Sequence, residues 1–353
     1  MAHRLSLVRR LGELRRLYTA ETDSTLWPAV TTGIASLTDQ SRTTIRDVLD
    51  TGFETRLLGE NSLPPVDDRM RCAVLSDATD PAQQQLEAAV LFALGRTAPY
   101  RWPATSVVAP MPVCTMVHPD IKDMRTVLHL RPAAAAPMLA ELLPHAVNGR
   151  VHGMPGLRVS LRRRHVRLCL ADSGESVSVA LAGTSFRQWS AMLAFAGVLT
   201  GHEWPPVFED PLSAPERGAI AAGCVPGPAW LASALFRRLR VLGTTVWLTV
   251  REDGPTCIRV EWCGGRTAAQ VATALVHPLA GLPGDVFTAT RDGADSVTVT
   301  IEGAADWAAA TVILRRASLS ASPPFDRIDT VDAWKAFKLV MAQPHLVSPK
   351  PAA

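Results

Sequence analysis

The sequence predicts an α+β protein in which a helical N-terminal region is followed by two repeated β-α-β-β-α units. In the first hundred residues, apolar side chains recur at helical spacing. Beyond residue 105, runs of β-branched residues take over, and the same order of strands and helices occurs twice. The expected divisions are a helical domain at 1–100, a first repeat at 105–200, a proline-rich linker at 201–229, a second repeat at 230–320, and a C-terminal helix and tail at 325–353.

The N-terminal region is expected to hold four helices, at 7–18, 27–37, 41–49 and 81–94. The fourth has the clearest boundaries, because Asp80 is a good N-cap, Pro81 suits the first helical position and Gly95 can end the helix. In the first helix, leucines share one face and arginines occupy the rest. This pattern favours a helix that docks through its apolar face, with a membrane-surface or nucleic-acid helix as the alternative.

Each repeat is expected to combine strands with two helices. In the first, strands are predicted at 107–117 and 126–130, a helix at 133–147, a hairpin at 157–161 and 166–170, a strand at 177–181 and a helix at 185–199. In the second, strands are predicted at 246–250 and 257–262, a helix at 266–280, a hairpin at 286–290 and 296–301, and a helix at 305–316. A last helix is predicted at 331–341.

A short internal match supports the repeat. Ser176–Gly183 aligns with Ser296–Gly303 at four identical positions, and a two-residue gap then places Trp189 over Trp307. The identity alone is thin, and the shared order of elements is what favours a duplication. The basic hairpin described next occurs in the first copy only, because the matching turn of the second copy is Arg291-Asp292-Gly293.

Basic residues gather on the first hairpin and on a later helix. The candidate binding residues are Arg158, Arg162, Arg163, Arg164, His165 and Arg167 of the hairpin, with Arg237, Arg238 and Arg240 as a second cluster. Alternation along the strand places Arg158 and Arg162 on the solvent side. A basic β-ribbon can grip phosphates or enter a nucleic-acid groove. Arginines also decorate exposed sheet edges, where they discourage aggregation, and this alternative stays open.

The overall composition is that of a globular protein with a slight net charge of +3. Arginine supplies 32 of the 36 basic residues, a bias typical of GC-rich, actinobacterial-type genomes. The six cysteines show no C-x-x-C spacing, and neither a signal peptide nor a long apolar run is found, so we expect a cytoplasmic protein without membrane association. No metal, nucleotide or nucleophile motif is present, and no cofactor is expected.

These observations favour a non-enzymatic binding or assembly protein. The basic hairpin would meet an acidic partner, possibly nucleic acid or another polyanion, and the N-terminal helices would contact a protein. One alternative is an enzyme whose dispersed site residues meet between the two repeats. Another is a structural subunit of a larger complex.

Overall fold

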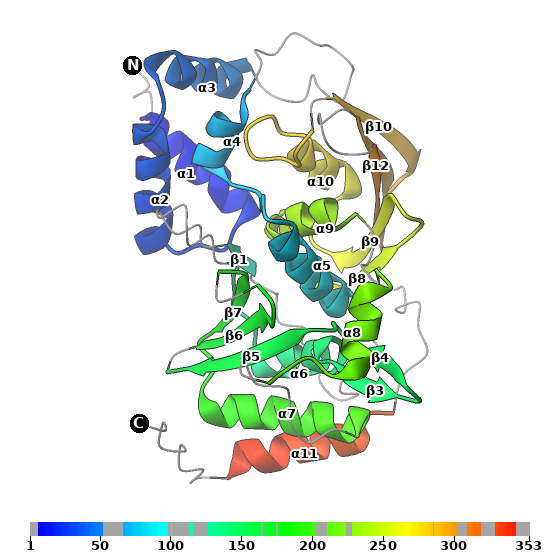
Figure 1. Ribbon diagram of the computed structural model, residues 1–353. Helices are drawn as coiled ribbons and strands as arrows, with labels where there is room; N and C mark the ends of the chain where they lie inside the picture. The colour runs from blue at the N-terminus through cyan, green and yellow to red at the C-terminus, as the bar shows by residue number, and fades with distance from the viewer. Residues whose placement is uncertain are drawn as a thin grey trace.

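The computed structural model describes residues 6–51, 66–97, 100, 113–115, 126–163, 165–173, 176–201, 210–223, 228–284, 286–302, 309–318 and 329–343. The protein has an α+β fold, in which N-terminal helices precede two mixed five-stranded sheets with their helices. In Figure 1 the N-terminal helices lie at the upper left, the second sheet at the upper right and the first sheet in the lower half. Helix α5 lies between these parts, so it is the element that connects them.

The N-terminal helices are α1 (Leu7–Tyr18), α2 (Asp23–Ala35), α3 (Asp39–Thr51), α4 (Asp68–Val74) and α5 (Pro81–Gly95). The expected start of α5 is confirmed, since the Asp80 side chain accepts a hydrogen bond from the backbone N–H of Ala82 at 2.8 Å. Most of α5 is buried, as expected for a helix that is apolar nearly all round. Helix α1 buries Leu11, Leu14 and Tyr18 against the protein's own chain, so its apolar face is already covered.

The first sheet contains β1 (Val113–Thr115), β2 (Thr126–Leu128), β5 (Leu157–Arg162), β6 (His165–Leu170) and β7 (Ser178–Ala182), in the order β1-β2-β7-β6-β5. Among the described strand pairs of this sheet, only β2–β7 is parallel. Its helices are α6 (Pro132–Leu142) and α7 (Phe186–Thr200), and a small hairpin, β3 (His145–Val147) with β4 (Arg150–His152), follows α6. Helix α7 begins close to the predicted start at 185, with a capping box between Ser185 and Gln188.

The second sheet contains β8 (Thr245–Glu252), β9 (Cys257–Gly264), β10 (Val286–Gly293), β11 (Ser296–Glu302) and β12 (Ala310–Ala317), in the order β8-β9-β12-β11-β10. Its accompanying helices are α9 (Ala229–Phe236), the 3-10 helix η3 (Leu239–Leu242) and α10 (Ala268–Leu275), whereas α11 (Val331–Ala342) packs against α7 of the first sheet (Figure 1). Here too only one pair, β9–β12, is parallel. In chain order, each sheet therefore places its strands first, second, fifth, fourth and third.

Two sequence-based expectations are wrong in the second half. The helix expected at 305–316 overlaps β12, whose β-branched residues Thr311, Val312 and Ile313 pair in register with β9. The aligned segments Ser176–Gly183 and Ser296–Gly303 contain β7 and β11, which hold different places in their sheets, because the strand beside β9 is β12. Trp307 lies outside the described residues.

The stretch expected to be a linker also contains structure. Helix α8 (Ala214–Ala221) lies within it and begins with a capping box between Ser213 and Glu216. The strand expected at 107–117 is described only at Val113–Thr115, and the rest of that range lies outside the described residues.

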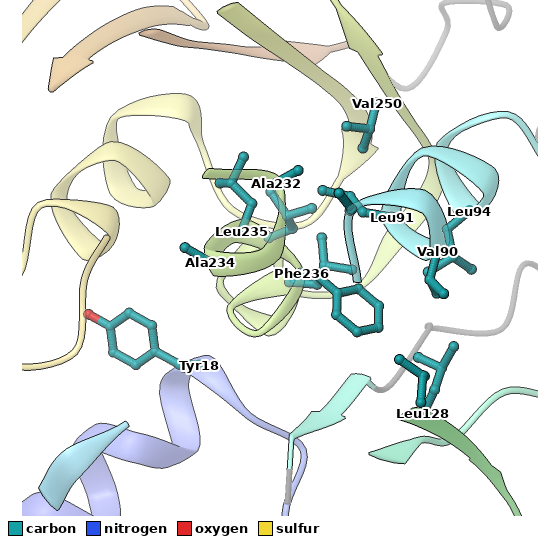
Figure 2. Packing of buried hydrophobic residues seen from close by; sticks show 14 of the residues in the cluster. Tyr18, Val90, Leu91, Leu94, Leu128, Ala232, Ala234, Leu235, Phe236 and Val250 are labelled. Carbon is teal, nitrogen blue, oxygen red and sulfur yellow. The ribbon is translucent and has the colours of Figure 1, made fainter. Parts of the chain in front are cut away.

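A continuous apolar core joins these elements. Figure 2 shows its centre, where Leu91 of α5, Phe236 of α9 and Val250 of β8 converge. The contact between α5 and β8 is very close, because a Cβ added to Gly95 would lie 2.3 Å from the backbone nitrogen of Val250. Within the described ranges, no helix is both long enough and apolar enough to cross a membrane.

Candidate functional site

The nine basic residues predicted as a binding surface do not share one environment. Arg158, Arg167, Arg237 and Arg238 are buried, Arg162, Arg163 and Arg240 are exposed, His165 is half-buried, and Arg164 lies outside the described residues. The expectation that Arg158 faces solvent is therefore wrong, and the expectation for Arg162 is confirmed. A buried guanidinium that already has partners cannot receive a ligand, so the exposed basic surface is much smaller than the sequence indicates.

Arg158 is buried because residues 210–216 cover the face of β5 on which it lies. Its terminal nitrogens donate to the two carboxylate oxygens of Glu216, at 2.8 and 3.2 Å, and its Nε donates to the carbonyl of Asp210 at 3.0 Å. The backbone N–H groups of Gly156 and Ser213 also donate to Glu216. Burial would raise the pKa of Glu216, but these hydrogen bonds lower it from 4.5 to about 2.

Arg237 forms a buried bidentate pair with Glu87 of α5. Its Nε lies 2.8 Å and its Nη2 lies 2.6 Å from the two carboxylate oxygens, and both side chains are almost fully buried. Three neutral side chains also donate to this carboxylate: Gln83, Thr126 and Ser233. Burial alone would raise the pKa of Glu87, but the charge and hydrogen bonds of Arg237 hold it below its ordinary value.

Arg238 points into a second buried network. It pairs with Asp77, with Nη1 2.5 Å from one oxygen and Nη2 3.1 Å from the other, and its Nε donates to the carbonyl of Ala280 at 2.8 Å. Arg71 of α4 approaches the same carboxylate and donates to the carbonyls of Pro278 and Gly281. Arg237 and Arg238 therefore hold the N-terminal helices against the second half of the chain, and both side chains are buried.

A cavity of about 330 Å³ lies beside α5, on the side of the first sheet. Its apolar lining comes from Ala82, Ala89, Phe92, Leu142, Met154, Pro155, Leu170, Ala171 and Ile220. Polar side chains of Gln85, Arg96, Glu141, Asp172 and Ser173 also line it. We name this space the apolar chamber. It is contained between α5, the end of α6, the turn after β6 and α8, and its size is typical of small-molecule sites.

A second cavity, of about 390 Å³, shares Arg96, Glu141 and Gly153 with the apolar chamber. Its other polar residues are Tyr100, His145, His152 and Thr200, and we name it the polar chamber. The rings of His145 and His152, on the paired strands β3 and β4, are stacked with centroids 5.5 Å apart.

The wall between the chambers is an ordered polar cluster. The Glu141 carboxylate pairs with Arg96, whose Nε lies 3.0 Å from Oε2, and its Oε1 accepts a short hydrogen bond from the Tyr100 hydroxyl. Burial and the neighbouring carboxylate raise the pKa of Tyr100 far above its ordinary value, so the phenol keeps its proton. Its backbone carbonyl accepts a hydrogen bond from the Trp334 indole at 2.9 Å, which ties the cluster to α11.

In the part of the chain that the structure describes, no group of three histidine, cysteine or acidic side chains is placed to hold a metal ion. Comparison with family models, with curated proteins and with solved structures gave no match. The sequence motifs had likewise pointed to no catalytic centre.

Sequence reasoning missed both the polar cluster and the buried networks. One signal was nevertheless available, because Glu87 and Glu141 are each the single charged residue in an otherwise apolar or uncharged helix. A lone carboxylate in such a helix must meet a partner when the helix is buried. The partners themselves are distant in the sequence or, like Arg96, sit just beyond another helix, and the folded chain alone brings them together.

Proposed function

We propose that this is a non-enzymatic binding protein that contacts an acidic partner through the tip of the β5–β6 hairpin. The observation that supports this is the exposure of Arg162 and Arg163 at the turn, beside the half-buried His165. These three residues are called the hairpin tip below. The arginines at the base of the hairpin, Arg158 and Arg167, are by contrast buried.

The base of the hairpin favours a preorganised binding surface. Arg158 and Glu216 tie β5 to α8, and β6 pairs on its other side with β7. Because the backbone beneath the hairpin tip is already ordered, little conformational entropy remains to be lost there when a partner binds.

The small number of exposed arginines favours a short acidic segment over a long duplex. Each arginine can neutralise about one phosphate, and each phosphate contact contributes a slope of about −0.9 in log affinity against log salt concentration. For Arg162 and Arg163 alone we expect a slope of about −2. Two exposed arginines can neutralise only a few negative charges. A short acidic segment of a protein therefore matches them better than a long nucleic-acid duplex does. Helix α1 would offer a protein partner only its polar side, since its apolar face is covered.

Fluorescence anisotropy with labelled oligoglutamate and labelled duplex DNA tests the proposal. We expect the oligoglutamate to bind with a shallow salt dependence, and the double variant R162A/R163A to lose about tenfold in affinity or more. The matched control is R291A, because Arg291 is exposed at the corresponding β10–β11 turn of the second sheet. Equal binding by the tip variant and the wild type would refute the hairpin proposal, and steep salt dependence with DNA would shift the partner to nucleic acid.

We also infer that the two sheet units arose by duplication. The inference is supported by the identical strand order and by the single parallel pair at the same place in each sheet. The repeated unit is then β-β-α-β-β-β, with β7 equivalent to β12, and it replaces the β-α-β-β-α unit predicted from the sequence. Superposition of the two sheets in this register should bring α6 over α10. Helices on opposite faces would contradict a duplication.

A further inference from the structure

We propose that the two adjoining chambers beside α5 bind a small molecule with an apolar body and an anionic head, with the head held by Arg96. This site is separate from the hairpin tip, and neither proposal depends on the other. The argument rests on three features: the shape of the chambers, the bonding of Glu141 and the placement of charge.

The two chambers differ in character although they share a wall. Nine of the residues that line the apolar chamber are hydrophobic, and its polar groups lie among them at a few positions. The polar chamber is lined by Tyr100, Thr200 and the stacked histidine pair. A cavity with apolar walls and a few convergent polar groups is the usual form of a small-molecule site. The arrangement therefore fits an amphipathic ligand.

The Glu141 carboxylate is already occupied and so does not attract a cation strongly. One of its oxygens faces the Nε of Arg96 and the other accepts from Tyr100. Among the described residues, Arg96 pairs with Glu141 through its Nε, and none of them accepts a hydrogen bond from its two terminal amino groups. A guanidinium fixed on one side in this way presents a planar pair of donors, which matches a carboxylate or a phosphate.

The charges around the polar chamber favour the same ligand class. Among the described residues, Glu141 is the only carboxylate that lines this chamber, since Asp172 belongs to the apolar chamber only. The Nδ1 of His145 lies 3.0 Å from the carbonyl of Leu143, and because a carbonyl only accepts, this nitrogen carries a hydrogen. The Nδ1 hydrogen of His145 is thus directed to the Leu143 carbonyl, and the histidine pair adds no negative charge opposite Arg96.

Isothermal titration calorimetry with ligands of equal chain length tests the ligand class. Octanoate and octyl phosphate supply anionic heads, octylammonium supplies a cationic head and octanol a neutral one. We expect both anions to bind about tenfold more tightly than octylammonium and octanol, because a hydrogen bond to a charged group is stronger than a neutral one. The ratio of octanoate to octyl phosphate distinguishes a carboxylate site from a phosphate site.

Variants locate the binding within the chambers. R96A should remove the preference for the anions, and R96K should retain part of it, because lysine keeps the charge without the planar donor pair. Q85W should weaken all four ligands, since the half-buried Gln85 lines the apolar chamber and a larger side chain fills it. The matched control is R131A, which removes an exposed arginine that lines neither chamber.

The proposal is overturned if none of the four molecules binds, if octylammonium binds as tightly as octanoate, or if R96A binds octanoate like the wild type. Circular dichroism of each variant establishes that the fold is intact, and Arg96 is exposed enough for its replacement to leave the core unchanged.

Discussion

Glu87 and Arg237 meet inside the core, where unpaired charges are very costly. The desolvation of such a pair offsets much of its attraction, so its presence alone is weak evidence for stability. Its geometry is more informative. The carboxylate accepts five hydrogen bonds, two from Arg237 and one each from Gln83, Thr126 and Ser233. These donors belong to α5, β2 and α9, so one side chain fixes the relative position of three elements.

Removal of one partner of this pair should be severely destabilising. In R237A the Glu87 carboxylate stays buried without its counter-charge, and we expect the free energy of unfolding to fall by about 3–5 kcal/mol. Urea denaturation followed by circular dichroism measures the change. The control K335A breaks the exposed pair with Asp332 and should leave the urea midpoint unchanged within error. A loss in R237A no greater than that of K335A would show that the network contributes nothing.

Glu216 should make stability depend on acid pH. Its pKa is about 2 in the folded protein and near 4.5 when unfolded, so the folded state favours the charged form. The stabilisation is therefore complete above about pH 5 and disappears as the pH falls toward about 2. In E216Q this contribution is absent. The difference in unfolding free energy between the wild type and E216Q should shrink steadily over that range, and a constant difference would contradict the assignment.

At the scale of elements, local signals predicted much of the fold. The cap at Asp80, the start of a helix at 185 and the alternation in β5 and β6 depend on neighbours in the chain, and each was predicted. The strand β12 was mistaken for a helix because the alanines before it favour helix, whereas its pairing with β9 joins residues about 54 positions apart. Likewise, the alternation along β5 was read correctly, but nothing local indicates that residues 210–216 cover Arg158.

Of the candidate sites too, only the one that depends on neighbours in the chain could be predicted from the sequence. The exposed hairpin tip could be predicted from the charges of one turn. The chambers could not, because α5, α6, β6 and α8 each supply part of the lining and no single segment carries the pattern. The single glutamates of α5 and α6 are the sequence feature that points to such sites. A charged residue in an apolar helix that becomes buried needs a partner from elsewhere in the chain.

Gly95 and Gly218 should respond in opposite directions to alanine. Both lie in helices, where alanine normally stabilises by about 0.5–1 kcal/mol relative to glycine. A Cβ at Gly218 meets nothing within 4 Å, so G218A should gain this stability. A Cβ at Gly95 would collide with the backbone of Val250, and G95A should lose about 1–3 kcal/mol. Thermal denaturation of the two variants measures these changes in stability. A higher thermal stability of G95A than of the wild type would contradict the close contact between α5 and β8.

At the scale of the whole molecule, the N-terminal helices are bonded to the second sheet unit across a long sequence distance. The Tyr18 hydroxyl of α1 donates to the carbonyl of Ala274 in α10 at 2.8 Å, and burial raises the pKa of this phenol far above its ordinary value. Arg71 and Arg238 supply further links between these parts. Glu87 then connects α5 to the first sheet through Thr126 and to α9 through Arg237.

Because α5 is shared in this way, the two sheets should unfold together. Hydrogen exchange measured by mass spectrometry at rising urea concentration can follow β6 and β9 separately, and we expect both strands to reach one common opening free energy in the wild type. R237A removes the buried ion pair between α5 and the end of α9, which weakens the connection between them, and should separate the two curves. R158A provides the matched control, since it breaks a buried pair between β5 and α8 and should lower stability without separating the sheets. If β6 and β9 of the wild type instead reached different opening free energies, the two sheets would unfold separately. This result would contradict the proposal that α5 couples their unfolding.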